Sequence, residues 1–111
     1  MDKIDFKDFA KVEFKIGEIK EAEEIKESEK LLKLSVDLGE DKLRRVFAGI
    51  KKWYSAEDLI GKKTVFVTNI VPRKIMGEES EAMIFGAEDE SEENMSLLLL
   101  DKDLPNGSKV F

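Results

Sequence analysis

The fold is decided by residues 32–50, which read LKLSVDLGEDKLRRVFAGI. Apolar and polar residues alternate from Leu32 to Leu38, a period-two pattern that is typical of a half-buried β-strand. Residues 39–42, Gly-Glu-Asp-Lys, carry a turn signal, and residues 43–50 predict the strand that follows. The segment therefore predicts a β-hairpin around which the rest of the chain can be arranged.

The residues before this hairpin predict one more strand. Residues 12–19 alternate in the same way, and Gly17 within them suits a bulge or a sharp bend. The polar residues 21–29 predict a connection between this strand and the hairpin. We therefore expect three strands in the first half of the chain.

After the hairpin, residues 55–61 predict a short helix. Ser55 suits its N-cap, because a side-chain hydroxyl can accept a hydrogen bond from the first turn, and Gly61 suits the position after its end. Further strands are expected at residues 63–70, 82–87 and 96–100, with an acidic loop at residues 88–94 and a turn at residues 105–107.

This order predicts an all-β domain with a short helix: an oligonucleotide/oligosaccharide-binding (OB) fold, which is a five-stranded barrel, with small extra strands. An SH3-like barrel is the alternative, and the helix between the third and fourth strands favours the OB order. The chain has 111 residues, without a repeat or a Pro/Ser/Gly-rich linker. We therefore expect one domain over residues 1–111.

Composition argues against most enzyme chemistry. The chain has no Cys and no His, which removes disulfides, thiol or imidazole catalysis and most zinc sites. No nucleotide-binding or hydrolase motif is present, and the acidic run at residues 88–93 lacks the ligand spacing of a calcium loop. We expect no catalysis, no cofactor and no metal.

The chain also lacks a long apolar run and a signal-peptide pattern, so we expect a cytoplasmic protein without a membrane partner.

Charge is distributed unevenly along the chain. The formal net charge is −6, yet residues 42–74 hold nine of the 19 Lys and Arg residues and only two of the 25 Asp and Glu residues. A basic middle third between acidic flanks can present a local positive surface on an acidic protein. The alternative is that these charges are simply solvated.

Residues 69–85, NIVPRKIMGEESEAMIF, concentrate the features of a polyanion-binding segment. Pro72 and Gly77 shape the backbone, while Arg73 and Lys74 supply cations at the exit of a predicted strand. Other basic pairs flank the predicted helix and can equally be solvated loop ends. The adjacent aromatic residues at 53 and 54 can stack on bases or pack over one end of a barrel.

Five segments together resemble the tRNA-binding domain family, and they follow one another in the family's order over almost the whole chain. They are residues 6–19, 30–39, 45–50, 69–83 and 104–110. The family includes free-standing homodimeric tRNA-binding proteins, C-terminal domains and separate β subunits of methionyl-tRNA synthetases, and CsaA-type chaperones. The resemblance implies an OB barrel that grips the outer corner of tRNA by shape, without reading the anticodon.

The resemblance also implies a set of RNA-binding residues. Carried over residue by residue, they are Lys30, Lys33, Arg45, Asn69, Arg73, Lys74, Ser80 and Met83. The cations would contact phosphates, and the polar side chains would bond sugars or base edges. The chain departs from many relatives at Glu81, where they carry Gln, and at Glu78 and Glu79, which add negative charge beside the implied site.

The sequence therefore predicts a non-catalytic, structure-specific tRNA-binding protein of protein biosynthesis. It would act as a free-standing homodimer or as an accessory (β) subunit beside the methionyl-tRNA synthetase catalytic chain, since 111 residues leave no room for a catalytic domain. The alternative is a CsaA-type export chaperone that binds unfolded polypeptides. A third possibility is a subunit that only docks another protein.

Overall fold

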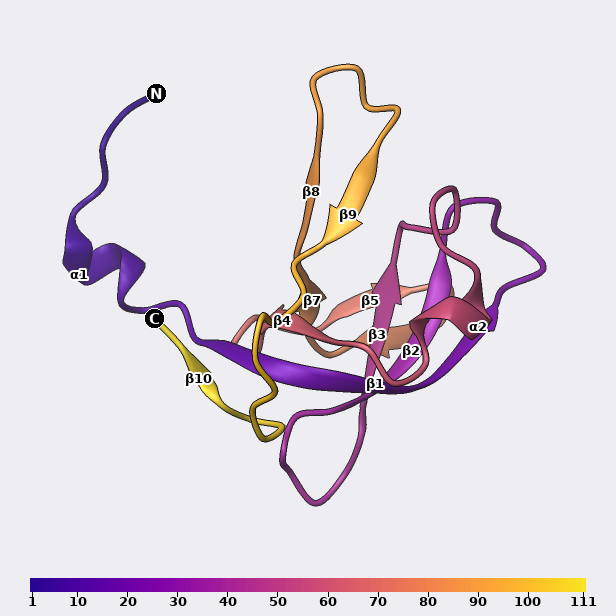
Figure 1. Ribbon diagram of the computed structural model, residues 1–111, viewed down its shortest axis with the longest axis horizontal. Helices are drawn as coiled ribbons and strands as arrows, with labels where there is room; N and C mark the ends of the chain where they lie inside the picture. The colour runs from indigo at the N-terminus through magenta and orange to yellow at the C-terminus, as the bar shows by residue number, and fades with distance from the viewer.

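The computed structural model describes residues 1–111, and strands dominate it (Figure 1). In chain order the elements are α1 (Phe6–Phe9), β1 (Phe14–Glu24), β2 (Leu32–Asp37), β3 (Arg44–Ala48), α2 (Ala56–Leu59), β4 (Lys63–Val67), β5 (Arg73–Ile75), β6 (Glu78–Ser80), β7 (Met83–Ile84), β8 (Gly86–Glu88), β9 (Met95–Leu97) and β10 (Lys109–Val110). No helix is long and apolar enough to cross a membrane.

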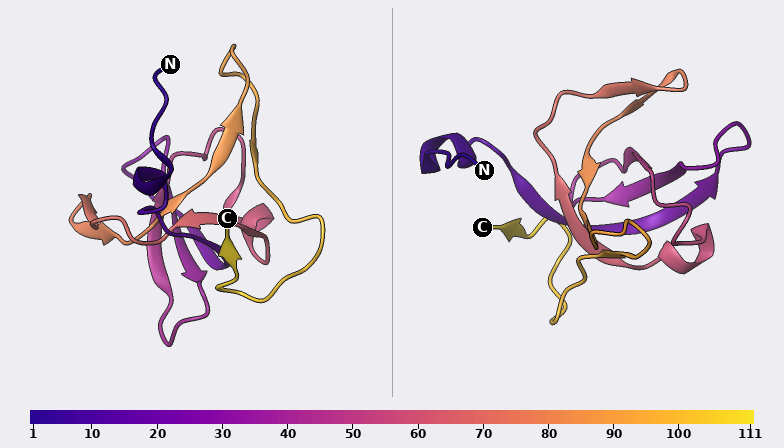
Figure 2. Two further views of the ribbon diagram at one scale, coloured as in Figure 1. Left: turned by 90° about the vertical axis from the view of Figure 1, so that its left-hand side faces the viewer. Right: turned by 90° about the horizontal axis from the view of Figure 1, so that it is seen from above.

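The long strand β1 organises the sheet. Its first half pairs with β4 and β10, its second half pairs with β2, and the register shifts between Ile19 and Glu21. This bulge bends β1 so that one strand serves both halves of a sheet ordered β3-β2-β1-β4-β7 (Figure 2). All pairings are antiparallel. The sheet is an almost closed five-stranded barrel, which confirms the predicted OB-like fold.

Side chains complete the closure between β3 and the segment that joins β6 to β7. The amide of Glu81 donates to the carbonyl of Arg45 at 2.8 Å, and the Glu81 carboxylate accepts the Arg45 amide at 3.1 Å. The Ser80 hydroxyl accepts the Phe47 amide at 3.0 Å. These bonds satisfy backbone donors along β3 that would otherwise face an open edge.

The core follows from the period-two pattern of the strands. Leu32, Leu34 and Val36 of β2 are fully buried, and Phe66 of β4 lies among them. Gly17 faces this cluster: a Cβ built on it lies 2.7 to 2.9 Å from side-chain atoms of Val36, Leu38 and Phe66. Gly17 is therefore required by close packing inside the bent strand.

The short helix α2 closes one end of the barrel, as expected. Ser55 caps it by accepting the Asp58 amide at 3.3 Å, Gly61 follows it with a φ of +90°, and Leu59 is fully buried. Trp53 and Tyr54 pack against the core. The Tyr54 hydroxyl also accepts the Leu97 amide at 3.1 Å, so packing rather than base stacking explains this aromatic pair.

Three expectations about the strands were wrong. Residues 21–29 are not wholly a connection, because β1 continues to Glu24 and its outer face carries the polar side chains. The single strand expected at residues 82–87 is divided: β7 pairs with β4, whereas β8 pairs with β9 in a separate hairpin that rises from the barrel (Figure 1). Of the acidic residues 88–94, Glu88 ends β8 and residues 89–94 form the tip of this hairpin.

The third difference concerns the segment after Pro72, where no strand was expected between residues 70 and 82. It forms the β5–β6 hairpin around a two-residue turn, Met76 and Gly77, whose φ angles are both positive at 50° and 85°. Such turns favour Asn-Gly or Asp-Gly, so Met-Gly gave only a weak signal in the sequence. Backbone strain is confined to Met76, a non-glycine residue with positive φ, because Gly77 adopts a positive φ without strain.

Replacing Gly17 with Ala should destabilise the domain by about 1 to 3 kcal/mol, because the new methyl group overpacks the core. Urea unfolding followed by Trp53 fluorescence measures the change. Gly49→Ala is the control, since a Cβ at Gly49 meets nothing within 4 Å. Equal stability of the two variants would contradict the packing argument.

Candidate nucleic-acid interface

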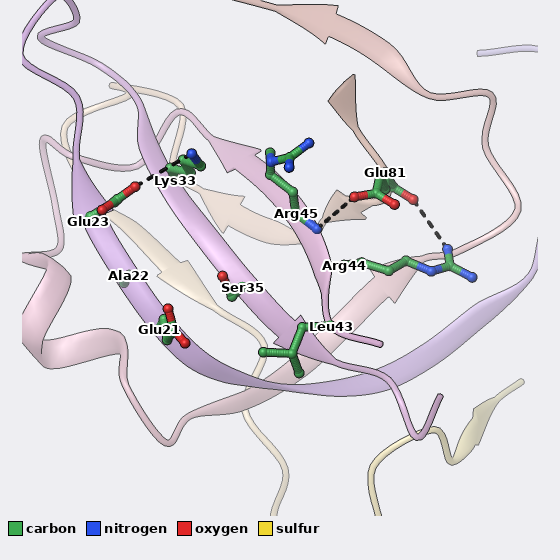
Figure 3. A pocket seen from close by; sticks show the side chains of 9 residues that line it. All are labelled: Glu21, Ala22, Glu23, Lys33, Ser35, Leu43, Arg44, Arg45 and Glu81. Atoms are coloured by element: carbon green, nitrogen blue, oxygen red, sulfur yellow. Dashed lines mark hydrogen bonds and ion pairs between the residues drawn. The ribbon is translucent and has the colours of Figure 1, made fainter. Parts of the chain in front are cut away.

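The outer face of β1, β2 and β3 carries a groove. Two cavities of about 360 and 470 Å³ run along this face and share Glu23 and Lys33, and we call them together the outer groove. Figure 3 shows the smaller of the two. Residues that pair across the strands have their side chains on the same face of the sheet. Glu23 of β1 pairs with Lys33 of β2, which pairs with Phe47 of β3, so these three form one row across the face. The neighbouring row includes Arg45.

The β5–β6 hairpin forms one wall of this groove. Met76 and Glu78 line its larger cavity. Cross-strand pairing places Ile75 opposite Glu78, and both are partly buried toward the barrel. The hairpin therefore presents an acidic side chain to the cations of β2 and β3.

Two of the predicted RNA-binding cations meet at that side chain. The Lys33 ammonium lies 2.9 Å from Glu78 Oε2 and 3.6 Å from Glu23 Oε1, and Arg45 Nε lies 3.4 Å from Glu78 Oε1. The hydrogen bond with Glu78 raises the pKa of Lys33, and its counterpart lowers the pKa of Glu78. Both groups are therefore charged at neutral pH.

An apolar pocket of about 170 Å³ lies beyond Phe47, which lines both this pocket and the outer groove. Its other lining residues include Ile70, Val71, Arg73 and Met83. Val71 is 80% exposed and Met83 is 43% exposed, so the pocket offers apolar surface to a ligand. Arg73 supplies a cation beside that surface.

Arg73 and Lys74 do not act on one surface. Both are exposed, but they are successive residues of β5, so their side chains point to opposite faces of the hairpin. Arg73 pairs with the buried Ser80 and lines the apolar pocket, whereas Lys74 pairs with the exposed Glu79. Of the two, Arg73 is directed toward the apolar pocket and Lys74 is not.

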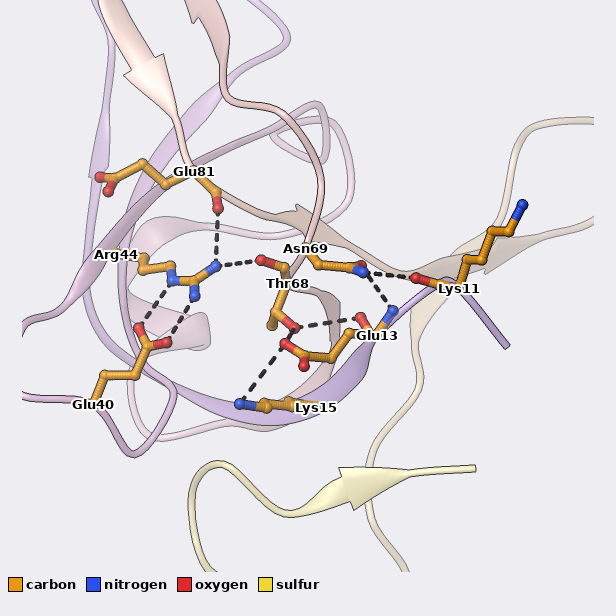
Figure 4. A network of polar contacts seen from close by, with 8 residues as sticks. All are labelled: Lys11, Glu13, Lys15, Glu40, Arg44, Thr68, Asn69 and Glu81. Atoms are coloured by element: carbon orange, nitrogen blue, oxygen red, sulfur yellow. Dashed lines mark hydrogen bonds and ion pairs between the residues drawn. The ribbon is translucent and has the colours of Figure 1, made fainter. Parts of the chain in front are cut away.

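Asn69 and Ser80 already use their polar groups inside the protein. Asn69 Oδ1 accepts the Glu13 amide at 2.7 Å, and its Nδ2 donates to the Lys11 carbonyl at 2.7 Å (Figure 4). The Ser80 hydroxyl is buried and binds the Phe47 amide. RNA contact by either side chain stays a prediction, and in this structure both position the backbone around the site.

Lys30 lies in the connection between β1 and β2. Its side chain is exposed and forms no ion pair, while its carbonyl accepts the Lys51 amide at 3.2 Å. Residues 25–27 of the same connection line the larger cavity of the outer groove. Lys30 is therefore an exposed cation of this connection and does not itself line the groove.

Arg44 has a different role from Arg45, although both line the smaller cavity of the outer groove. Its guanidinium binds both carboxylate oxygens of Glu40 at 2.9 and 2.7 Å, and Nη1 donates to the carbonyls of Thr68 and Glu81 at 2.6 and 3.2 Å (Figure 4). The bond to Glu40 raises the pKa of Arg44. Arg44 therefore holds the barrel together, and its guanidinium is already bonded to groups of the protein itself.

The sequence did not single out Phe47 or Val71 as site residues. Phe47 could have been found from alternation, because it follows Arg45 by two positions on a predicted strand. The exposed side chain of Val71 and the ion pair of Glu78 depend on contacts between distant segments, for which local sequence carries no signal.

Comparison with known proteins decides the family. Residues 14–109 match the family described as “Putative tRNA binding domain”. The chain belongs to this tRNA-binding domain family. Over 110 residues it is 50% identical to the methionine–tRNA ligase of Methanocaldococcus jannaschii and 46% identical to that of Caldanaerobacter subterraneus subsp. tengcongensis. Each alignment covers 99% of this chain but only 17% of the ligase, so the chain spans about a sixth of these curated relatives.

Solved structures of similar proteins have the same fold as this chain. A MetRS related protein from Pyrococcus horikoshii superposes with a TM-score of 0.91 at 38% identity and is covered completely, as is this chain. The chaperone CsaA from Bacillus anthracis superposes with a TM-score of 0.88 at 34% identity, covering 99% of this chain and all of its own. The tRNA-binding domain thus resembles proteins with two different named functions.

Ser80→Ala should lower the free energy of unfolding by about 1 to 3 kcal/mol, because it leaves the buried Phe47 amide without an acceptor. Ser35→Ala in the outer groove is the control and should change stability little. Urea unfolding gives both values, and binding measured on folded protein shows whether Ser80 also contacts RNA. A stable Ser80→Ala variant with lost binding would contradict the structural role.

Proposed function

We propose that this domain binds tRNA, without catalysis, in the outer groove and the adjoining apolar pocket. The observation that carries the proposal is the meeting of Lys33 and Arg45 at one anionic position, in a member of the tRNA-binding domain family. Arg73 adds a third cation beside the pocket. Cations bind phosphates irrespective of sequence, which suits recognition of RNA by shape.

The pocket gives this surface a second kind of contact. Val71 and Met83 expose apolar side chains next to Arg73, so an unstacked base or a ribose can lie against them while the guanidinium contacts its phosphate. Lys30 and Lys74 would add contacts at the margins. The role of Asn69 and Ser80 would be to hold this surface in shape.

The biological role that fits is delivery of tRNA to methionyl-tRNA synthetase in the cytoplasm, during protein biosynthesis. The relationship to methionine–tRNA ligases supports it, because a tRNA-binding domain raises the effective tRNA concentration at a catalytic chain. We further propose action as a separate chain or accessory (β) subunit; the likeness to the MetRS related protein from Pyrococcus horikoshii supports a role connected with a methionyl-tRNA synthetase.

A homodimer is the second part of the proposal. α1 buries none of its residues, and Phe6 is 79% exposed. A line of aromatic rings runs from Phe6 through Phe9 and Phe14 to Phe85, with centroids 6.3, 5.5 and 5.4 Å apart. The fully exposed Phe111, at the C-terminus, lies toward the same end of the molecule as α1 (Figure 1). A second copy would cover this apolar surface.

CsaA-type binding of unfolded polypeptide is the other candidate function. The apolar pocket favours it, since eight of its 11 lining residues are hydrophobic and Met83 is adaptable. The likeness to CsaA from Bacillus anthracis supports it equally. Capture of an unfolded polypeptide, with no competition by tRNA, would favour the chaperone function over tRNA binding.

Bulk tRNA should bind in a gel-shift or filter assay, with an affinity that falls as salt increases. Arg45→Ala and Arg73→Ala should each weaken binding roughly tenfold and reduce the salt slope by about one. Arg73→Ala should account for most of the loss in Arg73→Ala/Lys74→Ala, because Lys74 points away. Lys102→Ala, outside the groove, is the matched charge control. Absence of binding by the wild type at low salt would refute the tRNA proposal.

Light scattering at micromolar concentrations should give the mass of a dimer. Phe6→Ser/Phe9→Ser should raise its dissociation constant roughly tenfold or more, because each phenyl group would bury its apolar surface in the interface. Val71→Ser removes an equally exposed apolar side chain from the pocket and should leave the dimer intact. A monomeric wild type, or a double variant that still dimerises, would contradict this arrangement.

A further inference from the structure

The Glu78 carboxylate lies where two cations converge. Lys33 on β2 contacts it at 2.9 Å and Arg45 on β3 contacts it at 3.4 Å, each through a different oxygen at its closest approach. The two cations come from adjacent strands but are not cross-strand partners, since Lys33 pairs with Phe47 and Arg45 pairs with Ser35. The Glu78 carboxylate, which belongs to the β5–β6 hairpin, bridges Lys33 and Arg45.

The rest of the structure fixes the direction of the Arg45 guanidinium. Its Nη1 donates to the Glu79 carbonyl at 3.4 Å, while the Arg45 amide binds the Glu81 carboxylate. Lys33 is similarly bordered by Glu23 on the other side. Without an anion between them, the two like charges would repel each other, so the site is built to hold one.

Glu78 can leave this position at little cost. The side chains of Glu78, Arg45 and Lys33 are 40%, 38% and 27% exposed, and ion pairs in such surroundings stabilise a fold only weakly. Glu78 follows the Met76–Gly77 turn, and its removal from the cations requires only a change of side-chain rotamer. The hairpin backbone can stay in place.

We propose that Lys33 and Arg45 form a subsite for one RNA phosphate, and that Glu78 occupies this subsite in the unbound domain as a stand-in for the phosphate. The inference rests on the proposed tRNA-binding function and names a phosphate-binding element within that site. A backbone phosphate must displace Glu78 to bind. A polyanion with further phosphates at Arg73 and Lys30 can do so, whereas an isolated anion competes poorly.

The test compares Glu78→Gln with Glu79→Gln. Both remove one negative charge from neighbouring positions of β6, but Glu79 is exposed on the opposite face and forms no ion pair. Glu78→Gln should tighten tRNA binding roughly three- to tenfold at low salt, while Glu79→Gln should change it less than about twofold. Thermal unfolding should show that both variants are folded.

A double-mutant cycle locates the effect. In an Arg45→Ala background, most of the gain from Glu78→Gln should disappear, because one of the two cations of the subsite is missing. Equal tightening by Glu78→Gln and Glu79→Gln would overturn the inference and leave tRNA binding established. Weaker binding by Glu78→Gln would also overturn it. No tRNA binding by any variant would refute the proposed function itself.

Discussion

The closure of the barrel along β3 is the contact on which the rest of the structure depends. β3 pairs with β2 on one side, and on the other its backbone meets Ser80 and Glu81 instead of a regular strand. Because β6 pairs with β5 in its own hairpin, side chains must replace part of the missing ladder. The same few bonds therefore exclude water from the core and hold the hairpin beside the outer groove.

Strand alternation allows one short segment to build both the core and the site. On β3, Val46 and Ala48 point into the barrel, whereas Arg45 and Phe47 border the groove and the apolar pocket. The backbone beneath the proposed binding surface therefore belongs to the same strand that builds the core. A local cluster of cations on this strand and its neighbours is how an acidic domain would hold a polyanion.

The sequence predicted the elements whose signals are local. The β2–β3 hairpin and α2 were predicted correctly, because alternation, the Gly39 turn and the Ser55 cap each act within a few residues. The β5–β6 hairpin was missed, since its turn uses Met76 where Asn or Asp is usual. The pairing of Lys33 with Glu78 joins residues 45 positions apart and exists only once the barrel closes. The bonds that Asn69 and Ser80 make within the protein join residues 56 and 33 positions apart, so local sequence carries no signal for them.

A continuous polar network connects the barrel closure to the N-terminal arm, by which we mean residues 1–13 with α1. Arg44 binds the carbonyls of Glu81 and Thr68, the Thr68 hydroxyl donates to Glu13 Oε1 at 2.6 Å, and Asn69 binds the backbone of Glu13 (Figure 4). Each link crosses between different segments, so the base of the arm is fixed relative to the wall of the groove. If the aromatic arms join two copies as proposed, this network would also fix the two grooves relative to each other. A ligand recognised by shape requires such a constant spacing, and flexible arms could not provide it.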